Sequence, residues 1–531
     1  MERRSRRSAA KVKTGCKTCK FRRVKCDEQR PNCLKCTSTG RQCDGYASLK
    51  QGFEVHIWNP GQGPAFQKTV SLLPGLDDSV RYLEFYHRCA RPVLSGNFDN
   101  SFWSRTTLQM AFSEPAVRHA LIALGYLHST ESGSLKHARS RFTAITESKT
   151  FLHHYNMSVK SLVDRMGQSN YKTEVGLVTC LLFVCMEFLR GNHQTAFTHL
   201  INGLNIITER EKKVRHDSVN SPLSSCSVDT STTLTTFNIS TLIEDELKPI
   251  FIRALTSAML YGAVLDIRPY VTDLDLRHFE DLRFSNIREM ELSAYEVRNH
   301  SILQSRYLGL KRHFYQVKVF TAKELGQKQL VLDCQQAWYA ATEHYRNTHA
   351  LTKSDELVIQ ALLIGHYITY IWLLCQLDPT AMAIDAYLDE FQTVLLYCER
   401  ILDSMDLDTP QHAARFTFEI SLIPALYSVA LRCRCPVTRR KAVALLQRNP
   451  PREGLWDVAT HLLVAKRVIE MEEVEVDERG WPVERTRLWN VGVNADMDRK
   501  GGFWAYFTPN EELKKTVEEG RPLSKAEFLH V

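Results

Sequence analysis

The sequence predicts a small N-terminal module that is built around metal and contains two short helices, joined to a large all-α domain. Six cysteines recur at a regular, repeated spacing within residues 16–43, which is typical of a metal-stabilised fold. Apolar residues recur at helical spacing from about residue 76 onward, and strand-like alternation is scarce. A chain of 531 residues is long enough for the second domain to bury a large core.

Composition shifts set the expected order of segments. We expect a basic arm over 1–14, the cysteine module over 15–46, a Gly/Pro-containing linker over 47–75 and an all-α domain over 76–531, with a disordered Ser/Thr-rich insertion near 212–242. The linker carries no heptad seam of apolar residues. A dimer through the linker is therefore not expected, which leaves two alternatives: monomeric DNA binding, or a homodimer through the helical domain.

The positive charge is concentrated at the N-terminus. Residues 1–50 hold 15 Lys or Arg against 4 Asp or Glu, although the whole chain carries only +8. Such a basic segment on a slightly acidic body favours a polyanion-binding module. Arg3, Arg4, Arg6 and Arg7 give the arm the composition of a nuclear localisation signal. No apolar stretch of a secretory signal follows them, so we expect an intracellular chain with reduced thiols.

The cysteines repeat one spacing, C-x2-C-x6-C, twice. They are Cys16, Cys19, Cys26, Cys33, Cys36 and Cys43. Six thiolates are too few for two separate four-coordinate ions, but they suffice if two sulfurs bridge both ions. Zinc fits thiolate ligands and tetrahedral closure, so the spacing predicts two zinc ions per chain. A disulfide knot is the alternative, and the expected intracellular location argues against it.

The two halves of the repeat are filled differently. Residues 20–25 read KFRRVK, with four basic side chains, whereas residues 37–42 read TSTGRQ, with one. A helix of six residues is roughly 9 Å long and its end fits the major groove of DNA. The asymmetry indicates that the first half meets DNA and the second half mainly completes the metal cage.

This pattern resembles the fungal binuclear six-cysteine zinc cluster of transcription factors. The basic run after the second cysteine and Pro31, two positions before the fourth, belong to the resemblance. It implies that Cys16 and Cys33 are the bridging ligands. It also implies a nuclear regulator of RNA polymerase II genes that binds double-stranded, GC-rich DNA at CGG-type triplets and acts with the transcription machinery.

The resemblance also assigns the DNA contacts. It places residues of the basic helix just before the third cysteine against the bases. We expect Arg23 to read a base, with Arg22 beside it, because guanine offers O6 and N7 to a basic side chain. Lys20 and Lys25 are expected to contact phosphates, which position the module without specifying sequence.

Helical patterns fill the large domain. Residues 113–128 predict a helix with Ser113 as N-cap and Pro115 in its first turn. Residues 173–191 and 193–207 predict an antiparallel helix pair. The uncharged stretch 357–377 is long enough to cross a bilayer, but its polar residues favour a buried core helix with His366 as a core histidine. The last fifty residues are expected to be less regular, with their aromatic side chains packed onto the body.

A second resemblance concerns residues 102–128 and 439–457, which are similar to the fungal-specific transcription factor domain of the second type. It implies a regulatory helical domain. We weighed two other functions. An adaptor that uses zinc only for protein contacts would not need the cationic helix. An enzyme is not expected, since the sequence lacks G-x-S-x-G, G-x-x-x-x-G-K and H-E-x-x-H motifs.

Overall fold

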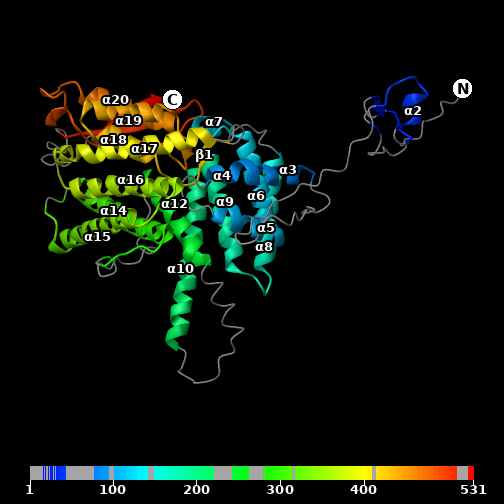
Figure 1. Ribbon diagram of the computed structural model, residues 1–531, viewed down its shortest axis with the longest axis horizontal. Coiled ribbons are helices and arrows are strands. Elements are labelled where there is room, and N and C mark those ends of the chain that lie inside the picture. Colours follow the sequence, from blue (N-terminus) through cyan, green and yellow to red (C-terminus); the bar gives the residue numbers. More distant parts are fainter. Residues whose placement is uncertain are drawn as a thin grey trace. The chain divides into compact units, whose positions relative to one another are not determined.

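The fold is seen in a computed structural model of the chain. The structure describes residues 16, 18–19, 22, 24–27, 29, 32–43, 77–94, 101–141, 149–220, 242–261, 279, 281–313, 317, 319–378, 380–408, 414–510 and 524–531. Contacts divide the chain into two units, Met1–Asp77 and Asp78–Val531. Both units are drawn in Figure 1.

The N-terminal unit contains the cysteine module. Its helix α2 spans Leu34–Thr37 and follows the fourth cysteine. Thr18 and Cys19 are also helical, but Lys20 and Arg23 lie outside the described residues. In the basic run, Arg22 lies in a turn, and Val24 and Lys25 are not helical. Of the expected pair of short helices, the one in the second half of the repeat is therefore seen, whereas a helix over 20–25 is not seen at these described residues.

The first part of the large unit is a group of helices around α6. Its elements are α3 (Asp77–Phe85), the π-helical η1 (Tyr86–Ala90), α4 (Arg91–Leu94), the π-helical η2 (Phe102–Thr106), α5 (Thr107–Ser113), α6 (Pro115–Thr130), α7 (Leu135–Arg141), α8 (Lys149–Met166), α9 (Thr173–Leu189), α10 (His193–Asn220), the π-helical η3 (Leu242–Leu247) and α12 (Lys248–Leu260). Helix α6 packs against α5, α8 and α9. A Cβ at Gly125 would collide with the carbonyl oxygen of Tyr82, so only glycine lets α3 and α6 approach this closely.

The start of α6 differs from the prediction. Pro115 is in the first turn as expected, but Glu114 is the N-cap and Ser113 ends α5. Ser113 is the usual residue type for an N-cap, yet α5 continues through it and only the extended backbone of Glu114 separates the two helices. The predicted N-cap was therefore wrong by one residue.

Helices α9 and α10 form the predicted pair and pack against each other. Almost every residue of α9 is buried, which explains its apolar character on all sides. Helix α10 continues to Asn220, so residues 212–220 are helical and the predicted disordered insertion does not begin at 212. The remainder of that insertion, 221–241, lies outside the described residues.

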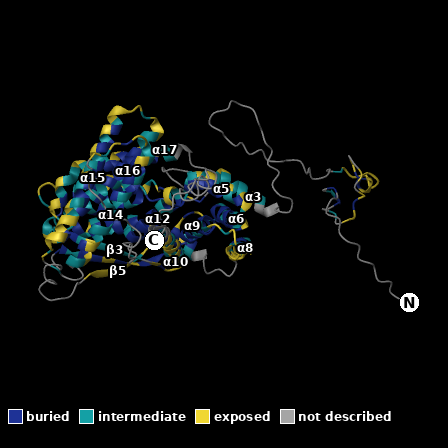
Figure 2. Ribbon diagram, turned by 90° about the horizontal axis from the view of Figure 1, so that it is seen from below, coloured by how far each residue is buried: buried dark blue, intermediate teal, exposed yellow. Residues whose placement is uncertain are grey.

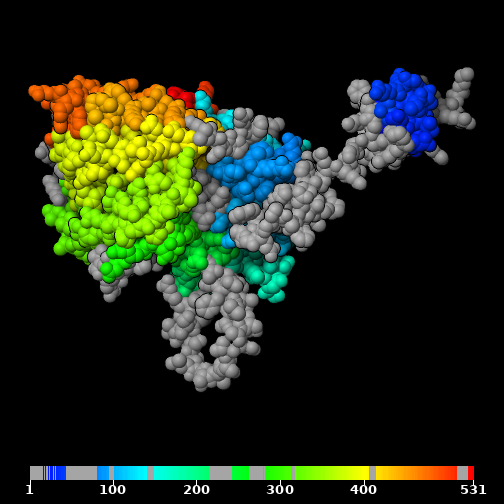
Figure 3. All heavy atoms as spheres, viewed as in Figure 1, coloured from blue at the N-terminus to red at the C-terminus, as the bar shows by residue number. Residues whose placement is uncertain are grey.

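The second part of the unit is a stack of longer helices. Its helices are α14 (Ile287–His313), α15 (Ala322–Thr348), α16 (Lys353–Cys375), the 3-10 helix η5 (Ala383–Tyr387), α17 (Leu388–Asp408), α18 (Ile423–Arg432), α19 (Pro436–Gln447) and α20 (Val458–Glu472). Successive helices lie side by side in Figure 1, and in Figure 3 they form surface bands from green to orange. In Figure 2 the buried residues lie along the inner sides of these helices.

Helix α16 contains the uncharged stretch. It is long and apolar enough to cross a membrane, and 56% of its most apolar window is buried. Its first turn is fixed by a capping box between Thr352 and Asp355. It packs against α14, α15 and α17, and His366 is only 8% exposed. These contacts agree with the core-helix interpretation and with His366 as a core histidine.

The prediction that the large domain is all-α was wrong at its C-terminal end, where the chain forms β-strands. Strands β3 (Leu488–Met497), β4 (Gly502–Pro509) and β5 (Lys525–His530) form an antiparallel sheet in the order β3-β4-β5, after the 3-10 turn η6 (Glu484–Thr486). Two-residue strands β1 (Phe416–Thr417) and β2 (Arg452–Glu453) pair in parallel. In β4 the odd-numbered residues from Phe503 to Phe507 are buried, whereas Trp504 and Tyr506 are exposed. The aromatic side chains therefore pack onto the body only in part.

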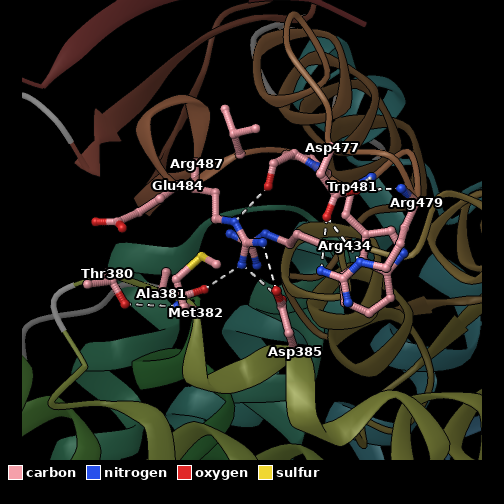
Figure 4. A network of polar contacts seen from close by, with 12 residues as sticks. Thr380, Ala381, Met382, Asp385, Arg434, Asp477, Arg479, Trp481, Glu484 and Arg487 are labelled. Atoms are coloured by element: carbon pink, nitrogen blue, oxygen red, sulfur yellow. Dashed lines mark hydrogen bonds and ion pairs between the residues drawn. The ribbon is translucent and has the colours of Figure 1, made fainter.

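A buried arginine fastens this C-terminal segment to the helices (Figure 4). The guanidinium of Arg487 donates to both carboxylate oxygens of Asp385, at 2.9 and 2.7 Å. It also donates to the carbonyl oxygens of Ala381 and Pro482. The side chain of Arg487 is 1% exposed, so these acceptors replace the water that the cation has lost.

Residues far apart in sequence close the domain. The hydroxyl of Thr417 donates to the carbonyl oxygen of Leu94 at 3.1 Å. The backbone N–H of Leu135 donates to the Asp457 carboxylate at 3.2 Å. Lys136 donates through Nζ to the carbonyl oxygen of Val531 at 2.6 Å. Early and late segments thus share one core.

Candidate metal centre and nucleic-acid interface

The six cysteines converge into two overlapping groups. One group is Cys16, Cys19, Cys26 and Cys33, and the other is Cys16, Cys33, Cys36 and Cys43. Within each group the sulfurs lie within 4.8 Å of one another. The first and fourth cysteines are common to both groups, which is the arrangement that two ions bridged by two sulfurs require.

The sulfur separations fit a zinc centre. The Sγ atoms of Cys16 and Cys33 lie 3.5 Å apart, and the Cys16–Cys36 and Cys19–Cys33 separations are 3.8 and 3.6 Å. A tetrahedral zinc with Zn–S bonds of about 2.3 Å places its ligands about 3.8 Å apart. The cysteine group therefore fits a binuclear zinc cluster.

Backbone hydrogen bonds reproduce the sequence repeat in three dimensions. The N–H of Cys16 donates to the Sγ of Cys26 at 3.4 Å, and the N–H of Cys33 donates to the Sγ of Cys43 at 3.5 Å. Each bond joins the first and third cysteine of one half, ten residues apart. Such N–H donors favour the thiolate form that binds metal.

Because these thiols are buried, their ionised thiolate form needs a cation beside it. The side chains of Cys16, Cys19, Cys33 and Cys36 are fully buried. Burial raises the pKa of the Cys16 thiol to about 12, and it raises the pKa of Cys33 further. At pH 7 these groups would be neutral thiols on their own, so the thiolate form needs positive charge beside it. Two zinc ions supply +4 against the −6 of six thiolates.

Asp27 joins the two halves of the module, although its sequence context does not reveal this role. Its carboxylate accepts hydrogen bonds from the backbone N–H groups of Leu34 at 2.8 Å and Lys35 at 3.2 Å. These donors begin α2, whose N-cap residue Cys33 offers no side-chain cap. Burial acts to raise the pKa of Asp27, but the N–H donors outweigh it and the pKa is lowered.

The basic run over residues 20–25 has four cationic side chains, and the structure describes two of them, Arg22 and Lys25. Arg22 donates through Nη1 to the hydroxyl of Thr39 at 3.5 Å, so it reaches from the first half of the module to the second. Lys25 is exposed. Lys20 and Arg23, together with Arg3, Arg4, Arg6 and Arg7 of the arm, lie outside the described residues. The structure therefore places Arg22 and Lys25 on the surface of the metal module.

Comparison with known protein families identifies both parts of the chain. Residues 14–52 match the fungal Zn(2)-Cys(6) binuclear cluster domain. Residues 81–246 match the fungal specific transcription factor domain. Both matched segments are therefore similar to domains of fungal transcription regulators, which are not enzymes.

Individual relatives of this zinc-cluster regulator carry matching names. An aspercryptin biosynthesis cluster-specific transcription regulator of Emericella nidulans is 31% identical over 227 residues, 38% of this chain and 35% of that protein. A transcription regulator of Purpureocillium lilacinum is 27% identical over 210 residues, 38% of this chain and 50% of that protein. A transcriptional regulatory protein of Schizosaccharomyces pombe is 61% identical over 36 residues, 7% of each chain.

The matched length is limited. This regulator spans no more than half the length of the first two relatives. No solved structure matches the chain. The family match to the regulatory domain ends at residue 246, within η3, so the second quoted segment of the sequence resemblance, residues 439–457, lies beyond it.

Proposed function

We propose that this protein is a sequence-specific DNA-binding transcription regulator whose zinc-stabilised basic helix reads CGG-type triplets in the major groove. The supporting observation is the pair of four-cysteine groups that share Cys16 and Cys33, directly beside a run of four cations. In the proposal the six cysteines hold two zinc ions, and these two shared residues bridge them. Bound zinc supplies the cross-link that a segment without its own core needs.

The proposed division of labour follows the two halves of the repeat. Arg23 reads a base, with Arg22 beside it, whereas Lys20 and Lys25 contact phosphates. The exposure of Lys25 suits a phosphate contact. The bond from Arg22 to Thr39 suits a residue that braces the helix against the second half. The arm with Arg3, Arg4, Arg6 and Arg7 directs the protein to the nucleus, where RNA polymerase II genes and the transcription machinery are its targets.

Selection from a random duplex library tests the proposal. Zinc-loaded full-length protein is selected at fixed physiological salt, and the bound pool is sequenced. We expect enrichment of CGG-type triplets. One triplet per site indicates a monomer, and two at fixed spacing indicate a dimer formed through the helical domain. A pool without any enriched motif, from protein that holds two zinc ions, would instead support a zinc-stabilised adaptor.

A pair of variants separates base reading from general attraction. Arg23→Ala is expected to cost about 1–3 kcal/mol of binding free energy at the selected site and much less on random DNA. Arg41→Ala is the matched control, because Arg41 is an exposed arginine in the other half of the repeat. Equal reductions in affinity for Arg23→Ala on both DNAs would make this residue a phosphate contact.

A further inference from the structure

A small cavity lies between three helices of the regulatory domain, α14, α15 and α16, which lie side by side in Figures 1 and 2. Its volume is about 10 Å³, roughly the space that one water-sized group occupies. Polar residues from all three helices line it: Arg298, Gln335 and Trp338, and His366. Apolar side chains complete the lining, so the cavity has room for a single small group that the few polar atoms can hold.

The cavity contains a cation without a matching carboxylate. Arg253, on the neighbouring helix α12, pairs with Glu419 through Nε at 3.0 Å and Nη2 at 2.8 Å. Both Arg253 and Arg298 lie over the ring of Tyr295, at 4.6 and 5.0 Å from its centre. Within the described part of the chain, Arg298 forms no ion pair and its buried Nε finds no acceptor. The site therefore holds two guanidinium groups against one paired carboxylate.

Some of the other hydrogen-bond donors around the cavity already have acceptors. Gln335 donates through Nε2 to the hydroxyls of Ser301 at 2.7 Å and Thr369 at 3.0 Å. Trp338 donates to the carbonyl oxygen of Met290 at 3.2 Å. In contrast, the Nδ1 of His366 has no partner among the described residues, although this side chain is only 8% exposed.

His366 is held as a neutral, rigid group. Its ring stacks on Tyr339 at 5.2 Å and lies 5.5 Å from Trp338. Burial lowers the pKa of His366 to about 3, so the ring is neutral at pH 7. In the tautomer with hydrogen on Nδ1, it offers one N–H donor beside the Arg298 guanidinium.

We propose that this cavity binds a small anion against Arg298, either a halide ion or the carboxylate head of a larger molecule. The buried Nε of Arg298 and the Nδ1 of His366 lack acceptors, and a buried donor without a partner costs free energy, so these donors favour a negatively charged ligand. The volume excludes a tetrahedral oxyanion such as sulfate. Arg298 is half-buried rather than enclosed, so the rest of a carboxylate ligand can remain outside the cavity.

Thermal unfolding of the full-length, zinc-loaded protein tests this site. The melting temperature is followed at constant ionic strength while sodium methanesulfonate, a tetrahedral oxyanion without a carboxylate, is replaced by sodium formate, bromide or sulfate. We expect formate and bromide to raise it saturably, by about 1–2 °C at ten times the dissociation constant, whereas sulfate does not. A rise with formate alone would assign the site to carboxylates, and a rise with bromide alone would assign it to halides.

Matched variants locate the effect. Arg298→Gln removes the charge and should abolish the saturable rise, whereas Arg312→Gln, on the same helix α14, should retain it. Equal rises in both variants, or no rise in the wild type, would overturn the proposal.

Crystals of the wild-type protein soaked in bromide give an independent answer that does not depend on folding of a variant. We expect an anomalous peak at Arg298 that formate displaces, and an empty cavity in the bromide data would also overturn the proposal.

Discussion

Cys16 and Cys33 place their sulfurs 3.5 Å apart, and both residues belong to each four-cysteine group of the module. Removal of a shared sulfur should therefore release both zinc ions, whereas removal of an unshared one should release one. We expect Cys16→Ala to bind no zinc and Cys26→Ala to retain one ion, measured as zinc per chain after gel filtration. Cys89→Ala, in the helical domain, should retain two. Two zinc ions on Cys16→Ala would contradict the bridging role.

Asp27 should matter to the module although it is not expected to touch metal. Asp27→Ala removes the acceptor of the Leu34 and Lys35 N–H groups, so α2 loses its cap. We expect a several-fold weaker apparent zinc affinity in competition with a chromophoric chelator. Asn32→Ala changes an exposed neighbour and should leave the affinity unchanged. Identical affinities for both variants would show that the carboxylate does not organise the module.

Lys25 should contribute to DNA binding without contributing to specificity. Lys25→Ala is expected to lower the affinity for selected and random duplexes alike, since a phosphate contact carries no sequence information. The slope of log K against log salt should become shallower by about 0.9, because the variant neutralises one phosphate fewer. Fluorescence anisotropy at several salt concentrations measures both quantities. A weaker affinity for the selected duplex alone would reassign Lys25 to base reading.

The Arg487–Asp385 ion pair should be a strong determinant of stability. Asp385→Ala leaves a buried guanidinium without its carboxylate, and we expect a cost of about 3 kcal/mol in the free energy of unfolding, measured by denaturant titration. Arg479→Met breaks the neighbouring pair with Asp477, which Figure 4 also shows, but that pair is exposed and its removal should change little. Similar effects of the two changes would mean that burial does not decide the outcome.

Glu453 should make stability depend on pH. Burial raises its pKa to about 7, against the lowering effect of N–H donors from Ser421, Leu422 and Ile423. The folded state then holds a proton that the unfolded state releases near pH 4.5. The free energy of unfolding should fall by about 3 kcal/mol as pH rises from 4.5 to 7, and it should change little from this group above pH 7.

A glutamine variant isolates that contribution. Glu453→Gln cannot ionise, so its free energy of unfolding should vary less between pH 5 and pH 7.5 than that of the wild type. Urea unfolding at both pH values provides the measurement. A wild type and variant with parallel pH profiles would show that this carboxyl titrates at the same pH in both states.

The metal module was readable from sequence because its constraints are local. Two cysteines separated by two residues place their sulfurs on one turn, and the count of six predicted that two sulfurs are shared. The resemblance to the zinc cluster then implied that these two are Cys16 and Cys33. Asp27 escaped because its partners, Leu34 and Lys35, are reached only after the chain folds back. A carboxylate in a charged segment has no sequence pattern that distinguishes a remote helix cap from a solvated side chain.

In the large domain, too, features set by local sequence were predicted, whereas features set by non-local contacts were not. Helix α9 and the pair that it forms with α10 were predicted because apolar residues recur within each helix. The sheet of β3, β4 and β5 was missed, although β4 alternates between buried and exposed residues. Gly492 interrupts β3, and the pairing of the strands joins residues that are far apart in sequence, such as Trp504 and Phe528. Non-local pairing leaves little trace in a single segment.

The bonds that join early and late segments also determine when the domain can close during synthesis. The hydrogen bond of Leu135 cannot form until Asp457, 322 residues later, has been synthesised, and the bond of Leu94 cannot form before Thr417. At 5–20 residues per second, a ribosome needs roughly 16–64 s to span the longer interval. During this time the helices around α6 lack the late segments that complete their shared core. The cysteine module emerges first and its ligands are complete within its own short segment, so it can acquire metal long before the domain behind it closes.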